Sequence, residues 1–241
     1  MKIRAPMYSP NVDGIDPDSC RNVMIEHNDI SCGDDHIAVK AGRCGGGAPL
    51  ECDQVKEFSD GTYETVNVTV RNNIFRIGMG IALGSDCSGG FRDFVIENNL
   101  VGVCQSGSCD DVCCGWSPAL HLKTADSRGG HMTNILFRNN TVYNTTSVIL
   151  LEHDYQSHDD RYPPNPTKFA NVSFQGNSAK GTAKSIMFNC YDEAHCENIT
   201  LASNDFDPST PVGCQNATVL DEKGDNVCSS LDMPAMAQQK N

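Results

Sequence analysis

Three aspartates, Asp13, Asp34 and Asp35, are the residues of this sequence whose types and spacing best suit chemistry. Asp34 and Asp35 are adjacent and precede the apolar run 37–40, whereas Asp13 lies in the turn-forming stretch 11–16. Two carboxylates at contact distance repel each other, so one of them tends to hold a proton. A protonated carboxyl group beside ionised ones can supply both the acid and the base of a hydrolysis. Because aspartate pairs are also common in solvated turns, the interpretation depends on the elements that position them.

Six segments of the chain share one pattern, in which Asn or Asp opens an alternating apolar run and Asn closes it. They span residues 22–28, 67–73, 93–99, 134–140, 171–177 and 198–204, and their closing asparagines are 45, 26, 41, 37 and 27 residues apart. A strand-sized unit that recurs with variable insertions and without intervening helical periodicity predicts a parallel β-helix. We expect one all-β solenoid domain over residues 1–232, a disordered tail over 233–241, and closing asparagines stacked in a hydrogen-bonded ladder.

The repeat predicts that the acidic pair and Met79 lie on the same face. Asp34 follows Asn28 by six residues, and Met79 follows Asn73 by six residues. Equal offsets in stacked coils place the two residues above one another.

The runs 37–40, 81–84 and 120–123 are expected to be equivalent strands of successive coils. Alternate positions of a strand point to the same side, so His121 and Lys123 should emerge together. The site is then a patch across adjacent coils, shaped for a polymer that lies along the solenoid.

The thirteen cysteines favour disulfides over metal ligands. Zinc sites use paired Cys-x-x-Cys halves, which these spacings lack, whereas dense cysteines are typical of secreted proteins. The odd count leaves at least one cysteine without a partner in the chain. The close pairs are Cys44 with Cys52, Cys190 with Cys196, and Cys214 with Cys228, the last closing a cap after the repeat fades beyond Asp207. Six glycosylation sequons support export; they begin at Asn67, Asn139, Asn144, Asn171, Asn198 and Asn216.

The net charge and the first residues bear on the partners of the protein and on its export. A net charge of −13 argues against nucleic acid and anionic membranes as partners. The sequence shows no signal-peptide pattern and no transmembrane run, and Met1–Pro6 reads as a strand entering a turn. We expect an N-terminal part that carries a secretion signal and further coils, and a secreted monomer that acts on a polysaccharide without a cofactor or metal.

Four motifs, taken in order, resemble the signatures of glycoside hydrolase family 28, the polygalacturonase and pectin-hydrolase family. The family forms are Asn-Thr-Asp, Gly-Asp-Asp, Gly-His-Gly and Arg-Ile-Lys, and the resemblance extends over about residues 1–206. In this chain the motifs lie at 9–16, 33–35, 78–80 with 83–85, and 120–124. The resemblance implies a right-handed parallel β-helix that hydrolyses glycosidic bonds in a pectin-type polysaccharide.

The resemblance also implies a role for each matching residue. Asp34 would be the general acid that protonates the leaving oxygen. Asp13 and Asp35 would hold and deprotonate the attacking water, in a single displacement with inversion, in line with the division of labour between carboxyl groups in glycosidases. Lys123 would bind the carboxylate of a uronic acid as a point charge.

Two positions depart from the family pattern. Met79 replaces the family histidine and cannot donate a hydrogen bond, so we expect a buried, gap-filling side chain there. His121 replaces the family arginine and offers no bidentate fork for a carboxylate. Both residues stay, with Asn11, in the expected substrate-binding set, but galacturonate should bind more weakly, or only in acid, or the substrate should differ.

Several alternatives remain open. The altered motif positions favour a rhamnogalacturonan or other pectic hydrolase, or a non-catalytic pectin-binding β-helix derived from an enzyme. A lyase would need a calcium cage and a strand-borne Arg or Lys base, for which there is no pattern, and a purely structural solenoid predicts no convergent acids. Convergence of the three carboxyl groups in one cleft separates hydrolysis from mere binding.

The remaining polar stretches predict loops. The histidines beside acidic residues, His27, His36, His153 and His158, fit solvated loops better than a metal site, because no spacing places them on one element. Tyr155 suits either stacking on a sugar ring or anchoring a loop. The insertion 102–117, which contains Trp116, is expected to form a disulfide-stapled loop at the cleft edge, and the glycine run 45–47 a flexible insertion.

Overall fold

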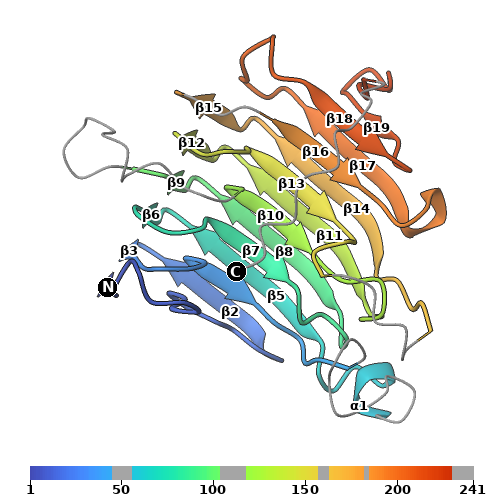
Figure 1. Cartoon of the computed structure of the whole chain (residues 1–241), viewed down its shortest axis with the longest axis horizontal. Coiled ribbons are helices and arrows are strands. Elements are labelled where there is room, and N and C mark those ends of the chain that lie inside the picture. The colour runs from blue at the N-terminus through green and yellow to red at the C-terminus, as the bar shows by residue number, and fades with distance from the viewer. Residues whose placement is uncertain (45–55, 104–117, 157–162, 182–184, 230–241) are drawn as a thin grey trace.

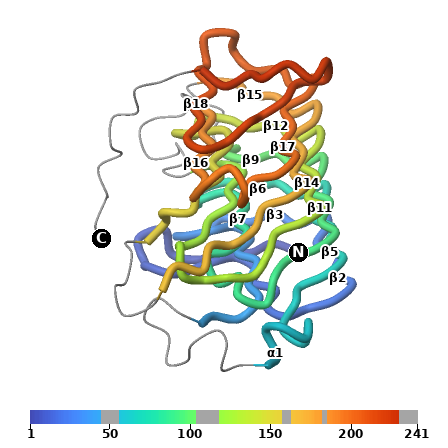
Figure 2. Tube along the Cα trace, turned by 90° about the vertical axis from the view of Figure 1, so that its right-hand side faces the viewer, coloured from blue at the N-terminus to red at the C-terminus, as the bar shows by residue number. Residues whose placement is uncertain are grey.

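The computed structural model describes residues 1–44, 56–103, 118–156, 163–181 and 185–229, which form three parallel sheets (Figure 1). Strands of successive coils lie side by side in each sheet, and Figure 2 shows the coils stacked from blue to red. The expected all-β parallel β-helix is confirmed. In the described residues the helical elements are the short helix α1 (Lys56–Ser59) and the 3₁₀ turn η2 (Glu193–His195).

Each sheet takes one strand from each coil. The seven-stranded sheet contains β2 (Arg21–Glu26), β5 (Thr65–Arg71), β8 (Phe91–Glu97), β11 (His131–Arg138), β14 (Lys168–Gln175), β17 (Cys196–Ala202) and β19 (Val219–Leu220). One six-stranded sheet contains β1 (Lys2–Arg4), β3 (Asp29–Ser31), β6 (Ile74–Phe75), β9 (Leu100–Val101), β12 (Thr141–Tyr143) and β15 (Ser178–Lys180). The other contains β4 (Ile37–Val39), β7 (Ile81–Gly84), β10 (Leu120–Lys123), β13 (Ile149–Glu152), β16 (Ile186–Asn189) and β18 (Val212–Gln215).

The alternation within the repeated segments places their apolar side chains inside the solenoid. In β11 the buried positions include Ile135 and Phe137, and the corresponding positions of β14 are Val172 and Phe174. Register pairing puts Phe137 directly beside Phe174, and their rings stack with centroids 4.9 Å apart. Burying such side chains contributes roughly 1.5–3 kcal/mol each, and neighbouring coils share this burial.

The asparagine ladder is confirmed. The side-chain amide of each closing asparagine donates to the amide oxygen of the next one, over distances of 2.9 to 3.1 Å. The same oxygen accepts from the preceding backbone, as when Asn99 Oδ1 accepts from Asn73 N. These groups are buried, apart from the half-buried Asn204, so the ladder satisfies polar atoms that would otherwise be costly to remove from water. Its members are Asn28, Asn73, Asn99, Asn140, Asn177 and Asn204.

A second, exposed row of side chains lines the outer face of the seven-stranded sheet. Asn171 donates to Asn134, and Asn198 donates to Asn171, at 3.1 and 2.8 Å. Several residues of this row have left-handed backbone angles, which asparagine tolerates well. A shallow groove of about 450 Å³ runs beside the row and is lined partly by Val95 and Leu136. It lies on a different sheet from β4, the strand that follows the acidic pair.

The C-terminal part of the solenoid extends further than the sequence pattern indicated. Strands β18 and β19 pair with β16 and β17, so the coils continue beyond Asp207, where the repeat was expected to fade. Disulfides join Cys190 to Cys196 and Cys214 to Cys228, as predicted, and Cys44 is also disulfide-bonded. Free thiols in the described part of the chain are those of Cys20, Cys32 and Cys87.

Some sequence predictions concern residues outside the described ranges. These include the glycine run 45–47, Cys52, nearly all of the insertion 102–117, His158 and the tail 233–241. Within the described ranges, no helix is long and apolar enough to cross a membrane.

Candidate active site

The sheet that contains β4, β7 and β10 aligns the acidic motifs as the repeat predicted. Ile37 pairs with Ile81, which in turn pairs with Leu120. Leu120 and Leu122 belong to the core, so His121 and Lys123 occupy the alternate, outward positions of β10. The equal offsets also hold, because Met79 N donates to Asp34 O at 2.8 Å.

The carboxyl groups of Asp13, Asp34 and Asp35 converge, with one oxygen of each lying within 4.8 Å of the others. Backbone bonds hold the two segments together: Asp34 N donates to Val12 O at 3.1 Å, and Gly14 N donates to Asp35 O at 2.9 Å. The two oxygens of Asp34 accept from Asn11 N at 3.2 Å and from Asp35 N at 2.9 Å. The sequence therefore identified three groups that the fold places in one site.

The turn after Asp13 requires a glycine at position 14. A Cβ atom at this position would lie 2.4 Å from His36 O, on the backbone that follows the acidic pair. Such an approach is too short for any side chain, so only glycine lets the two motif segments pack this closely.

Asp13 holds its proton more tightly than an ordinary aspartate. Burial raises its pKa to about 6, and hydrogen bonding and charge from Asp16 add to the rise, followed by the charges of Asp35 and Asp34. Lys40 opposes this effect, since its Nζ lies 2.6 Å from Asp16 Oδ2 and 3.5 Å from Asp13 Oδ2. The group is thus poised to change its charge in mildly acidic solution.

Asp35 forms a buried ion pair with Lys123. Lys123 Nζ lies 2.8 Å from Asp35 Oδ2, and both side chains are less than a tenth exposed. Burial raises the pKa of Asp35 and outweighs the opposing effect of Lys123, so desolvation, rather than repulsion from Asp34, is the main cause of its shift. Burial alone would lower the pKa of Lys123, but Asp35 raises it above its usual value.

His36 is a structural residue that the sequence interpretation placed wrongly. Instead of lying in a solvated loop, it is 1% exposed. Its Nδ1 accepts from Gly80 N at 3.0 Å, so its Nε2 carries the proton and donates to Ile77 O at 3.0 Å. The ring therefore fixes the Gly78–Gly80 turn beneath the acidic pair. Burial lowers the pKa of His36 to about 4, which keeps the ring neutral above that pH.

Met79 also differs from expectation. Its side chain is half-buried rather than enclosed as a gap-filler. A Cβ atom at Gly78 would lie 2.6 Å from His36 Nε2, and one at Gly80 would lie 2.5 Å from Pro118 O, just before β10, so neither glycine could carry a side chain. The turn thus owes its geometry to its glycines and His36, and Met79 contributes its backbone N–H to Asp34.

His121 has an acidic partner that sequence reasoning missed. His121 Nε2 lies 2.7 Å from Glu152 Oε1 on the next strand, β13. Tyr155, which is 43% exposed, lies edge-on to His121 and has Lys123 Nζ 4.7 Å from its ring centroid. The only sequence signal for Glu152 is its position in the repeat, where it pairs with Lys123.

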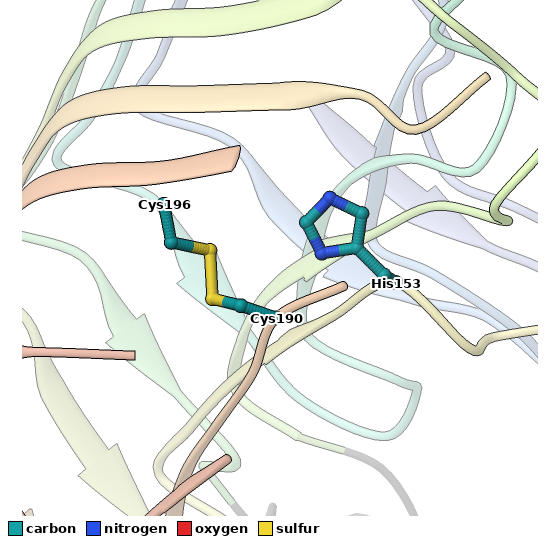
Figure 3. Close-up of side chains that lie close together, drawn as sticks. All are labelled: His153, Cys190 and Cys196. Carbon is teal, nitrogen blue, oxygen red and sulfur yellow. A yellow bond between two sulfur atoms is a disulfide. The ribbon is translucent and has the colours of Figure 1, made fainter. Parts of the chain in front are cut away.

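Among the residues that the structure describes, two groups of side chains have the spacing of metal ligands. In the three-aspartate group, the ammonium groups of Lys40 and Lys123 already contact two of the members, which opposes a divalent cation. The other group is His153 with Cys190 and Cys196 (Figure 3). Its cysteines form a disulfide, and His153 donates to Thr167 O while accepting from Tyr191 N. His153 is therefore a buried structural residue and not part of a solvated loop.

The chain is similar in sequence to known polygalacturonases. A polygalacturonase of Ralstonia nicotianae is 29% identical over 212 residues, which cover 86% of this chain and 35% of the relative. A probable polygalacturonase of Vitis vinifera is 32% identical over 168 residues, which cover 67% of this chain and 29% of the relative. The chain therefore spans about a third of the length of these relatives.

Solved structures show the same fold. The exopolygalacturonase of Thermotoga maritima superposes with a TM-score of 0.63 and 25% identity, covering 87% of this chain and 44% of that structure. A polygalacturonase from Erwinia carotovora superposes with a TM-score of 0.65 at 19% identity, covering 90% of this chain and 49% of that structure. The sequence profile described as Glycosyl hydrolases family 28 matches residues 1–228. The chain belongs to this family.

Proposed function

We propose that the protein containing this chain hydrolyses glycosidic bonds in a pectin-type polysaccharide and is secreted. The observation that carries the proposal is the convergence of the Asp13, Asp34 and Asp35 carboxyl groups within 4.8 Å in a member of a glycosyl hydrolase family. A site that only binds sugar does not need three clustered carboxylates. Disulfides Cys190–Cys196 and Cys214–Cys228 support secretion.

Asp34 is assigned as the general acid and Asp13 and Asp35 as the groups that hold and deprotonate water. The raised pKa of Asp13, about 6, suits a base whose proton affinity is close to the working pH. The Lys123 ammonium lies 2.8 Å from Asp35 and opposes the rise in its pKa that burial causes, which favours the ionised form that can accept a proton. Asn11 positions Asp34 through its backbone N–H.

The stereochemistry is a separate point. Family resemblance implies inversion, yet the oxygens lie within 4.8 Å, closer than the roughly 6.5–9.5 Å that usually separates the carboxyl groups of inverting enzymes. We propose that water is held by a pair of these groups on one side of the sugar, rather than between an acid and a base on opposite faces. Proton NMR of the first-formed anomer tests this: inversion supports the arrangement, and retention contradicts it.

The activity is tested by reducing-sugar release from polygalacturonate, methyl-esterified pectin and rhamnogalacturonan. We expect release from at least one polymer and its loss in Asp34→Asn. The control Asp207→Asn makes the same change at an exposed, remote aspartate and should keep full activity. Binding of a polymer by folded protein without any release would favour the sugar-binding alternative, for which Met79 and His121 are the motivating departures.

A further inference from the structure

The charges around the three aspartates are strongly unbalanced. The carboxylates of Asp13, Asp34 and Asp35 converge, Asp16 shares Lys40 with Asp13, and Glu152 lies beside His121 on the neighbouring strand. In the described part of the chain, the ammonium groups that contact these carboxylates are those of Lys40 and Lys123. Burial raises the pKa of Asp154, and the negative charge of Glu152 raises it further, so these two carboxyl groups repel each other electrostatically. A carboxylate that enters this site adds a further negative charge to an acidic surface, which is unfavourable.

Both ammonium groups already have carboxylate partners. Lys40 lies 2.6 Å from Asp16, and Lys123 lies 2.8 Å from Asp35. Lys123 is 7% exposed and the Tyr155 ring covers it at 4.7 Å. To hold a uronate, Lys123 would have to give up or share a buried ion pair, and leaving a buried charge unpaired is strongly destabilising.

His121 is arranged to receive a hydroxyl group rather than a carboxylate. The Glu152 carboxylate can only accept, so His121 Nε2 carries the proton of their 2.7 Å hydrogen bond. In the neutral ring, Nδ1 is then a lone-pair acceptor, and it is buried with no hydrogen-bond partner among the described residues. A sugar hydroxyl can donate a hydrogen bond to this atom. A carboxylate has no proton to donate, so its oxygen lone pairs would be repelled by the lone pair of Nδ1.

We propose that this site takes galacturonan whose bound residue is methyl-esterified, and discriminates against the free acid. The inference rests on the proposed function. Esterification removes the negative charge of the sugar, so an esterified residue can bind while Lys40 and Lys123 keep their carboxylate partners. Glu152 is then a specificity-determining residue, because it both adds charge and fixes the tautomer of His121.

The test compares one oligogalacturonide in its methyl-esterified and free-acid forms. Dissociation constants are measured by calorimetry with the Asp34→Asn variant, and kcat/KM with the wild-type enzyme. We expect a preference of about tenfold for the ester, equivalent to about 1.4 kcal/mol, which shrinks when salt is raised because exposed charges are screened. Glu152→Gln and His121→Arg should each narrow the preference by improving binding of the free acid.

A matched control removes the same charge elsewhere. Glu197→Gln on the outer face of β17, where Glu197 pairs with Lys168, should leave the preference unchanged. Tighter binding of the free acid by the wild-type site overturns the inference, as does an unchanged preference in Glu152→Gln. Absence of turnover on both forms, with the ester still bound more tightly, contradicts the proposed hydrolysis and supports this inference.

Discussion

Replacing Asp13 with asparagine should stabilise the fold at neutral pH while removing a group that we assign to catalysis. Asp13 has a pKa of about 6 in the folded protein, against an ordinary value of 3.8. The fold therefore disfavours the ionised form, and the penalty is absent below about pH 4, grows between about pH 4 and 6, and is complete above that. Asparagine has a similar shape and no charge to bury.

The expected size follows from the shift. Two pKa units correspond to roughly 3 kcal/mol, but Asp13 is 18% exposed and Lys40 lies 3.5 Å away. We therefore expect the free energy of unfolding of Asp13→Asn to exceed that of the wild type by about 1–2 kcal/mol at about pH 7.5 and by almost nothing at about pH 4. Urea unfolding at the two pH values measures both differences.

Asp29→Asn is the control of opposite sign. Hydrogen bonds from Arg76 lower the pKa of Asp29 to about 2, and its side chain is 19% exposed. This carboxylate contributes stability above about pH 4 that is lost as the pH falls towards 2, so its removal should cost about 1–2 kcal/mol at about pH 7.5. If Asp13→Asn destabilises the protein equally at both pH values, burial of its charge is not the dominant effect and the reasoning fails.

Three further outcomes are expected. Asn99→Leu should lower the free energy of unfolding by about 2–4 kcal/mol in urea titrations, because it removes the hydrogen bonds that the Asn99 side chain makes to Asn73 and Asn140 in the buried ladder, including the one that satisfies Asn73 N; a loss below about 0.5 kcal/mol would contradict this. Gly84→Ala should destabilise the fold by more than about 2 kcal/mol, measured in the same way, since its Cβ atom would lie 1.9 Å from Lys123 O at a φ of 105°. The kcat/KM of the enzyme should rise through an apparent pKa near 6, as Asp13 ionises; a profile that is flat between about pH 5 and 7 would exclude Asp13 as the base.

Much of the scaffold could be read from residue spacing alone. The closing asparagines predicted both the coil boundaries and the ladder, because a solenoid repeats one local solution and each coil sees almost the same neighbours. The six-residue offsets of Asp34 and Met79 predicted their adjacency for the same reason. The disulfides Cys190–Cys196 and Cys214–Cys228 follow from closeness in sequence.

The site chemistry depended on contacts that spacing does not encode. Lys123 meets Asp35 from 88 residues away, and His36 is buried beneath a turn contributed by the next coil. The adjacent aspartates suggested that like-charge repulsion would raise a pKa, whereas burial is the largest cause of the raised pKa values of Asp13 and Asp35. Residue spacing was enough to identify the equivalent positions of the repeat. The pairing and desolvation of the charges depend on the folded solenoid, because proton affinity is set by surroundings that distant strands create.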